Sequence, residues 1–159
     1  MVSDTSSISN LLLIHHLDLL QKIYYEIYIP PTVYTEILNL EKSGQNLEDF
    51  KTKAWIIVES EFPRNISLAP PKYVDAGGAE AIDLALHLKA ERLLIDERKG
   101  TLLANNLGIT TIGLLGVLII AKQNNLITSV KELLDQLVRN EFWLSDNLYQ
   151  QVLKSVNEL

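Results

Sequence analysis

The spacing of hydrophobic and polar positions changes along the chain and predicts alternating strands and helices. Short apolar runs typical of buried strands occur at 2–4, 24–29, 55–60, 91–96 and 109–113. Elsewhere apolar residues recur at the three- and four-residue spacing of amphipathic helices. These expected helical segments are 7–23, as one helix or two, and 31–44, 45–54, 79–90, 98–108, 114–126, 129–140 and 145–159.

Strands that alternate with helices favour βαβ units, and therefore a parallel sheet with helices on both faces. We expect an α/β fold with about five mostly parallel strands, as one domain over residues 1–159 with the last two helices appended. The segment 62–78 has the least regular pattern and is expected to form a loop or lid. In such sheets ligands bind outside the carboxyl ends of the strands, so residues at strand ends are the first candidates for a site.

Composition narrows the class of protein. Hydrophobic residues make up 47% and charged residues 21% of 159 residues, which is typical of a globular chain and not of a disordered one. The absence of cysteine excludes disulfides, thiolate metal sites and a cysteine nucleophile. The start MVSDTSSI carries an acid where a signal peptide needs basic residues, and the longest apolar run, 109–121, is too short to span a membrane. We therefore expect a cytoplasmic protein with no membrane partner.

Acidic residues follow two of the expected strands. Asp4 ends the first, and Asp96 ends the run RLLID and is followed by Glu97. Because parallel strands end at the same edge of a sheet, both aspartates are expected there. The alternative for each is a helix cap, which Asp favours and which an acid such as Glu97 stabilises at a helix start.

Two further acids are expected near helix starts. Glu36 neighbours the apolar face formed by Val33, Ile37 and Leu40, although it could also reach water at the rim of the helix. Glu80 is expected in the first turn of the helix after Gly78, where the helix dipole alone would favour an acid. Gathered carboxylates repel one another unless a cation is present, and hard oxygen ligands suit Mg²⁺ or Mn²⁺. Such a site could direct metal-bound water at a phosphodiester.

Several segments resemble the PIN-domain family, the nuclease fold of VapC-type toxins, and in particular an uncharacterised prokaryotic branch of it. The matching segments are SDTSSISNL, IPPTVYTEI, GGAEAIDLA, LLIDERKG followed by LGI, GLLGVLIIAK and FWLSDNLYQQVL. They run from one end of the chain nearly to the other in the family's order. The resemblance implies a three-layer PIN-like sandwich and endoribonuclease activity that depends on Mg²⁺ or Mn²⁺.

The resemblance also assigns roles to individual acids. It implies that Asp4, Glu36, Glu80 and Asp96 are catalytic, and that Asp4, Glu80, Asp96 and Glu97 hold the metal. Cleavage by the bound water would leave a 5′-phosphate.

Substrate contacts are expected from Ser6 and from the basic pair Arg98 and Lys99, which could bind phosphate as a fork and as a point charge. The alternative for the basic pair is ordinary surface charge on a helix. The chain departs from the family where Gly78 replaces the first acid of a Gly-Glu-x-Glu motif and where Thr101 replaces a basic residue.

Three hypotheses follow. The first is a ribonuclease that acts on single-stranded or structured RNA, as the toxin of a type II toxin–antitoxin pair, with a small antitoxin as partner and a homodimer as a compatible state. The second is a catalytically weak PIN-like module that binds a protein partner or RNA, which the departures at Gly78 and Thr101 favour. The third is a phosphoacceptor receiver domain, which the missing acid pair after the first strand and the missing lysine after the last one disfavour.

Other residues carry little signal for a site. His15 and His16 are adjacent and so face different ways on a helix, and His87 lies two turns beyond Glu80. Neither a nucleophile elbow nor a Walker loop is present. The net charge of −6 first argues against nucleic acid, but leaving out the five candidate site acids gives 14 − 15 = −1 for the rest of the chain. We therefore expect weak, metal-dependent substrate binding without a broad positive groove.

Overall fold

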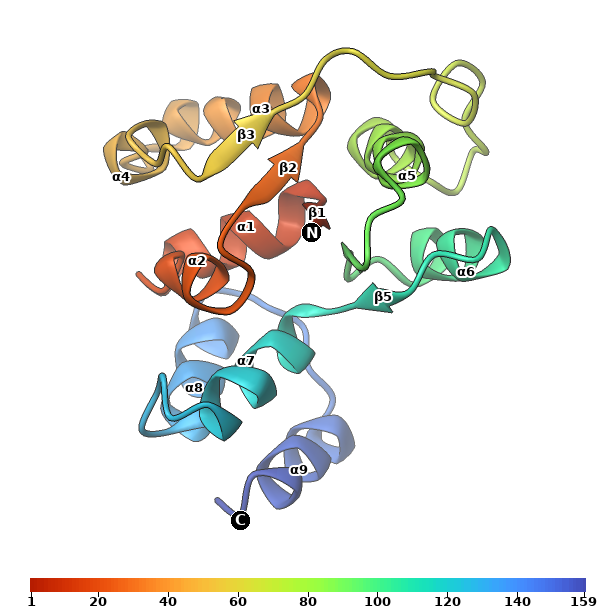
Figure 1. The fold of residues 1–159 in the computed structure, drawn as a ribbon. Helices are drawn as coiled ribbons and strands as arrows, with labels where there is room; N and C mark the ends of the chain where they lie inside the picture. Colours follow the sequence, from red (N-terminus) through yellow and green to blue (C-terminus); the bar gives the residue numbers. More distant parts are fainter.

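The computed structural model describes residues 1–159, which form one five-stranded sheet surrounded by helices (Figure 1). All neighbouring strands are parallel, in the order β3-β2-β1-β4-β5. The strands are β1 Val2–Ser3, β2 Ile27–Ile29, β3 Ile56–Val58, β4 Leu93–Leu94 and β5 Thr111–Ile112. The predicted α/β fold is confirmed, and the sheet is wholly parallel where a mostly parallel one was expected.

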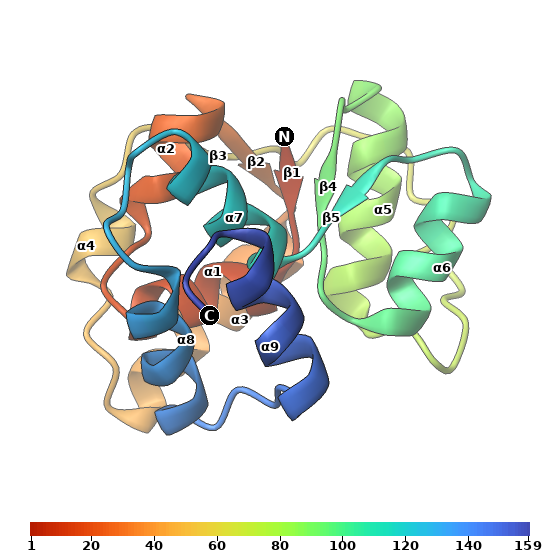
Figure 2. The same cartoon turned by 90° about the horizontal axis from the view of Figure 1, so that it is seen from below.

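Helices cover both faces of the sheet, so the fold has three layers. Figure 2 shows α5 and α6 on one side of the strands and the remaining helices on the other. The helical elements are α1 Thr5–Leu13, α2 Asp18–Tyr24, α3 Pro31–Leu38, the 3₁₀ turn η1 Asn39–Ser43, α4 Glu48–Lys51, α5 Ala76–Leu88, α6 Arg98–Asn106, α7 Leu114–Gln123, α8 Val130–Arg139 and α9 Asp146–Ser155. The strand β1 is central, with β2 and β3 added on one side of it and β4 and β5 on the other. Because the connections are right-handed, the helices of the two halves cover opposite faces of the sheet. None of the helices is long and apolar enough to cross a membrane.

The alternation of side chains along the strands divides the apolar interior between two layers. Ile27 and Ile29 of β2 and Leu94 of β4 contribute to a core of 26 buried residues beneath α1, α2 and α7. Val2 of β1 and Leu93 of β4 point the other way, into a core of 10 buried residues beneath α5 and α6. The strands β2 and β4 therefore pack against both helical layers, which fixes the sheet between them.

The pattern predicts that the last two helices are appended to the domain. In the structure they instead form part of the larger core. Leu134 and Leu137 of α8 and Leu153 of α9 are almost completely buried in that core. Their amphipathic faces would expose this apolar surface to water if the helices were detached, which is unfavourable in proportion to the area. The helices thus stabilise the same layer that positions α1.

Several local expectations differ from the structure. The run 55–60 was expected to be a buried strand, but Val58 is exposed because β3 is an edge strand that pairs only with β2. The helix expected at 31–44 ends at Leu38 and continues as η1 until Gly44 stops it with φ 87°. The helix expected at 45–54 is reduced to α4, since the Asn46 side chain accepts the Glu48 amide at 3.0 Å in a local turn that starts it late.

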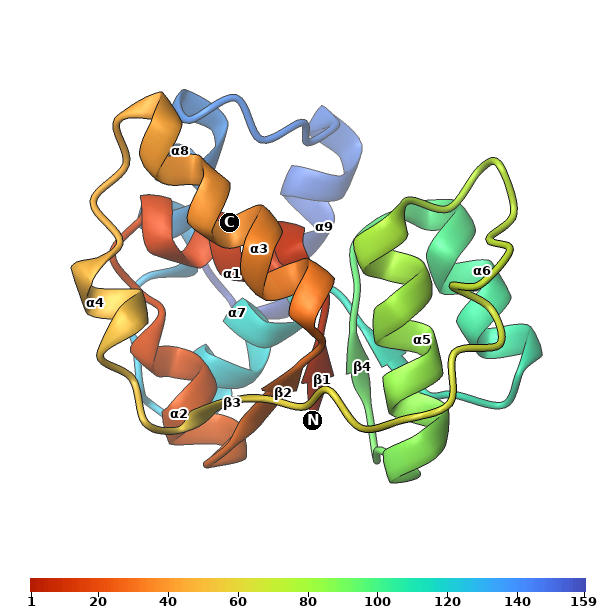
Figure 3. The same cartoon turned by 90° about the horizontal axis from the view of Figure 1, so that it is seen from above.

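The segment between β3 and α5 contains no helix or strand, as expected for 62–75, whereas residues 76–78 of the expected loop belong to α5. It runs from β3 past the sheet and along the outside of α5 (Figure 3). Asp83 of α5, which is 2% exposed, accepts the amides of Ile66 at 2.9 Å and Ser67 at 2.8 Å. A buried carboxylate with several donors is well satisfied, so this segment is tied to the helix along part of its length.

A second carboxylate holds the C-terminal helices together. Glu158 follows α9 and accepts the amides of Val130 and Lys131 at 2.8 Å each, at the start of α8. Lys122 Nζ lies 2.9 Å from the same carboxylate, and the Ser129 hydroxyl donates at 3.0 Å. Although burial would raise it, these donors lower the pKa of Glu158 to about 2.

We predict that Glu158→Gln lowers the free energy of unfolding by roughly 1–3 kcal/mol at pH 7. The lowered pKa means that the wild-type contribution is complete above the ordinary pKa of 4.5 and is lost as the pH falls toward about 2. Urea denaturation between pH 2 and pH 7 tests this. A variant whose stability equals that of the wild type at pH 7 would contradict it.

Candidate active site

Asp4 and Asp96 lie side by side where the strand order reverses. Asp4 follows β1, and Asp96 is the second residue after β4, the neighbouring strand. The Asp4 amide donates to the Leu94 carbonyl at 2.9 Å, which joins the two strand ends directly. The connections leave β1 and β4 toward opposite faces of the sheet, and this reversal is where open α/β sheets form their ligand crevice.

Ser7 links the two aspartates. Its hydroxyl donates to Asp96 Oδ2 at 2.6 Å, and its amide donates to Asp4 Oδ1 at 3.4 Å, which makes Asp4 the cap of α1. Asp96 Oδ1 accepts the Leu114 amide at the start of α7 at 2.8 Å. The sequence offers Thr5, Ser6 and Ser7 as hydrogen-bond partners of the Asp4 carboxylate, and only Ser6 was expected to contact substrate. In the structure the link is Ser7, the third residue after the capping Asp, whose amide such a cap accepts.

The two carboxylates are costly to ionise together. Burial, and then the charge of Asp96, raise the pKa of Asp4 to about 7, against the opposing hydrogen bonds from Ser7 and Ser6. Burial likewise raises the pKa of Asp96, although the Ser7 hydroxyl and the Leu114 amide oppose the shift. A divalent cation beside this pair would offset both the desolvation and the repulsion.

Asp75 is a third acid of this edge that the sequence pattern did not reveal. It is the cap of α5, where its carboxylate accepts the Gly78 amide at 2.6 Å, and its charge adds to the raised pKa of Asp4. The helix had been expected to begin near Ala79, but this cap starts it at Ala76. The sequence does contain a signal for this cap, because Asp75 precedes Gly78 by three residues at the start of a helical pattern.

Glu36 lies on the neighbouring part of the same edge. It is half-buried on α3 and accepts the hydroxyl of Thr5, the residue after Asp4. A Cβ at Gly77 of α5 would overlap the Glu36 carboxylate, so the glycine allows α5 to approach it closely. Of the predicted apolar face beside Glu36, Val33 and Ile37 are fully buried and Leu40 falls in η1.

Glu80 is buried and its carboxylate is occupied by two donors. Arg64 Nε lies 2.9 Å from Oε1, and the Thr32 amide donates to Oε2 at 2.8 Å. Although burial would raise it, these donors lower the pKa of Glu80. The sequence predicts Glu80 in the first turn of this helix. Because α5 begins at Ala76, Glu80 lies in the second turn. It thereby connects α5 to the start of α3 and to the β3–α5 segment.

Glu97 caps α6, where its carboxylate accepts the amides of Lys99, at 2.9 Å, and of Gly100. This local role is the helix cap that the sequence offers as the alternative to a metal ligand. Arg98 and Lys99 are exposed beside it at the start of α6. Thr101 donates its hydroxyl to the Glu97 carbonyl at 2.8 Å, so the residue that replaces a basic one contributes to the helix start.

The donor set can be compared with what a hard cation requires. No three His, Cys, Asp or Glu side chains converge as a ready-made metal site. Mg²⁺, however, is commonly held by one or two carboxylates and completes its shell with waters and substrate phosphates. Asp4, which is buried, and Asp96, which is partly buried, both have a raised pKa and fit that requirement.

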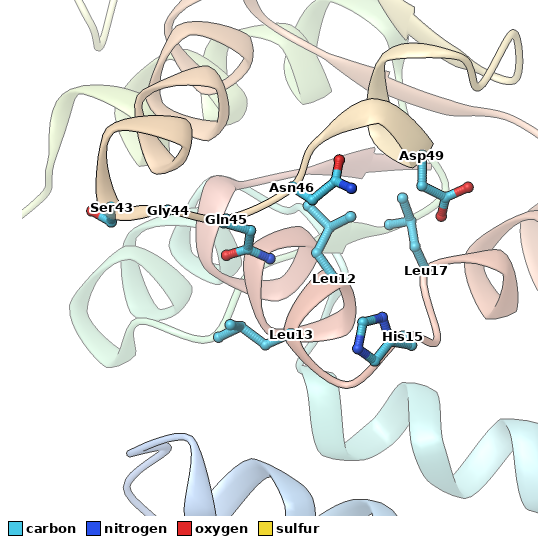
Figure 4. A pocket seen from close by; sticks show the side chains of 9 residues that line it. All are labelled: Leu12, Leu13, His15, Leu17, Ser43, Gly44, Gln45, Asn46 and Asp49. Atoms are coloured by element: carbon cyan, nitrogen blue, oxygen red, sulfur yellow. The ribbon is translucent and has the colours of Figure 1, made fainter.

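A cavity of about 560 Å³ lies elsewhere, between the end of α1 and the segment from η1 to α4 (Figure 4). Its lining includes His15 and Asp49, and Asp49 already pairs with Lys53 at 2.9 Å. None of the acids at the strand ends lines it. The acidic edge is therefore a different part of the surface.

We predict that the metal-free protein is most stable in mildly acid solution. Asp4 has an ordinary pKa of 3.8 when unfolded and about 7 when folded, so the folded state holds the extra proton between these values. The free energy of unfolding should fall by roughly 2–4 kcal/mol from pH 5 to pH 8 and recover when Mg²⁺ is added at pH 8. Denaturation in a chelator with and without Mg²⁺ measures this.

Asp4→Asn should remove most of that pH dependence, because the group that titrates is gone. Asp146→Asn is the matched control, since Asp146 is exposed at the start of α9, a helix that packs against α7 and α8. A wild-type protein that gains stability from pH 5 to pH 8 in the chelator would contradict the prediction.

Comparison with protein families assigns the chain. A family model described as a PIN domain, from an uncharacterised branch, matches residues 1–158. Comparisons with curated proteins and with solved structures gave no match. The parallel order of the strands and the acids at their carboxyl ends agree with the family match. The chain therefore belongs to the PIN-domain family, a nuclease-type family whose members typically use divalent metals.

Proposed function

We propose that the protein is a divalent-metal-dependent endoribonuclease, with Asp4 and Asp96 as the residues that hold Mg²⁺ or Mn²⁺. The observation that carries the proposal is the pair of carboxylates at the strand-order reversal, where Asp4 is buried, Asp96 is partly buried, and burial and repulsion raise the pKa of Asp4 to about 7. A cation bound at the carboxyl ends of the strands would stabilise the ionised forms of both carboxylates.

The surrounding residues support the pair in different ways. A bound metal ion would supply an activated water and neutralise charge on the phosphate oxygens. Ser7 and the Leu114 amide fix the Asp96 carboxylate, and Ser7 and Ser6 fix that of Asp4. Glu36, half-buried on the same edge, is placed to orient water or accept a proton near the pair.

The predicted metal ligands Glu80 and Glu97 are assigned a positioning role in this proposal. Each already accepts two hydrogen bonds, from Arg64 and Thr32 in one case and from the start of α6 in the other. Their substitution would therefore act through the β3–α5 segment and through α6. Ser6, Arg98 and Lys99 remain the proposed contacts to the RNA backbone, since all three are exposed beside the pair.

The chain is further proposed to be the toxin of a toxin–antitoxin pair, with an antitoxin that covers the acidic edge and with a homodimer as a compatible state. The alternative is a module that binds RNA or a protein without cleaving. It is favoured by one observation, namely that no three acidic side chains converge on one metal position. The cleavage experiment below distinguishes these functions.

Asp96→Asn is predicted to reduce cleavage of a labelled single-stranded RNA by at least about 100-fold in Mn²⁺ or Mg²⁺, because one of two charged metal ligands is lost. Gel analysis of the products and titration with Mn²⁺ followed by electron paramagnetic resonance measure activity and metal binding separately. Asp146→Asn, an exposed Asp to Asn change, should match the wild type in both.

Equal cleavage by the wild type and by Asp96→Asn would contradict the assigned site and indicate a contaminating nuclease. A wild type that binds Mn²⁺ and RNA but leaves every RNA intact would favour the binding module.

Glu80→Gln is predicted to keep Mn²⁺ binding while lowering the free energy of unfolding by about 1–3 kcal/mol, since it weakens the charge-assisted bonds to Arg64 and Thr32. Thermal denaturation and the same Mn²⁺ titration measure the two effects. Arg64→Ala should reproduce the loss of stability. Loss of Mn²⁺ binding with unchanged stability would instead make Glu80 a direct metal ligand.

A further inference from the structure

An exposed aromatic ring stands next to the acidic edge. Tyr73 lies in the segment just before α5 and its side chain is 52% exposed. A large aromatic side chain that remains in water at a site forgoes the stabilisation that burial would give. Its neighbours indicate what it could bind.

The backbone on both sides of Tyr73 is fixed. Val74 is buried, and its amide donates to the Pro71 carbonyl at 3.0 Å, which closes a turn around Lys72 and Tyr73. Asp75 is anchored as the cap of α5. The ring is therefore presented by a pinned turn that includes a proline, so little ordering is required when a ligand binds.

One cation without an ion-pair partner lies against the ring, and two more are adjacent along the chain to that cation or to Tyr73. Lys99 Nζ lies 5.8 Å from the centre of the Tyr73 ring, within the range of a cation–π contact. Arg98 precedes Lys99 on α6, and Lys72 precedes Tyr73, and all three are exposed. None of the three takes part in an ion pair, so each can bind a phosphate without giving up such a partner.

This basic and aromatic group adjoins the proposed metal site. Asp75, whose charge acts on Asp4, is only two residues from Tyr73, a span of at most about 7 Å. Lys99 is three residues after Asp96. The α6 amides beside it are already taken by Glu97, so positive charge for a ligand comes from the side chains.

We propose that Tyr73 is a stacking platform for an unpaired nucleobase of single-stranded RNA, and that Lys99, Arg98 and Lys72 bind the phosphates that flank this base. The identity of the ligand as RNA rests on the proposed function. Base stacking on an aromatic ring combined with cations along the backbone is how proteins bind single strands without reading sequence. A duplex keeps its bases stacked on one another and cannot offer that face.

The platform gives the protein a preference for single strands. It also binds RNA at one place on the surface. The rest of the chain has a net charge close to zero and is not expected to form a broad positive groove. Lys99 would exchange its contact with the ring for one with phosphate when a base covers Tyr73.

The test is equilibrium binding of a short fluorescein-labelled oligouridine and of a labelled RNA duplex, by fluorescence anisotropy in a chelator. Tyr73→Ala should weaken binding of the oligouridine by roughly 5- to 100-fold and leave duplex binding within about twofold of the wild type. Tyr73→Phe should bind the oligouridine like the wild type, because it keeps the aromatic face. Tyr73→Leu, which keeps apolar bulk without that face, should behave like Tyr73→Ala.

Tyr25→Ala is the matched control. Tyr25 is 79% exposed and precedes β2, so it lies at the amino ends of the strands, opposite the carboxyl ends that carry the aspartate pair. It should bind both RNAs like the wild type. Melting temperatures of all variants close to that of the wild type show that binding, and not folding, has changed.

The proposal is overturned if Tyr73→Ala binds the oligouridine as tightly as the wild type, or if Tyr73→Leu does so. Equal weakening for oligouridine and duplex would also overturn it, because that result indicates only lost charge or shape. Since the chelator removes the need for cleavage, failure of the nuclease proposal leaves this measurement intact. Cleavage by the wild type with unchanged binding by Tyr73→Ala would reject the platform alone.

Discussion

The placement of two carboxylates between adjacent parallel strands is the constraint on which the rest of the molecule depends. Asp4 and Asp96 are close because β1 and β4 pair directly, with the Asp4 amide bonded to Leu94. The order β3-β2-β1-β4-β5 places this pair where the helical connections diverge, so the strand ends stay open to a ligand. Ser7 then fixes both side chains from the first turn of α1.

The acidic character of the chain has two separate sources. Glu80, Asp83, Glu97 and Glu158 are occupied with backbone amides or cations and stabilise helix starts and the β3–α5 segment. Asp4 and Asp96 differ because burial raises the pKa of both, the charge of Asp96 further raises that of Asp4, and neither has an ion-pair partner. A carboxylate whose donors offset its burial favours folding, whereas a pair whose pKa values stay raised despite their hydrogen bonds favours binding of a cation.

Much of the architecture was readable from pattern. Five short apolar runs became five parallel strands, and Gly44 and Gly108 end helical segments with positive φ as glycine permits. The pattern was less informative where burial depends on neighbours. It could not tell that β3 is an edge strand, or that α8 and α9 complete the larger core, because apolar periodicity shows that a face is covered but not by what.

The sequence by itself determined the fold class and the candidates Asp4 and Asp96, because strand ends of a parallel sheet meet at one edge whatever the details. Only the tertiary structure decided which acids lie together. It ties Glu80 to Arg64 and Glu97 to its own helix, and it brings Asp75 and Ser7 to the aspartate pair. Such choices rest on hydrogen bonds and charges between segments far apart in the chain, over distances of a few ångströms that spacing along one strand or helix does not encode.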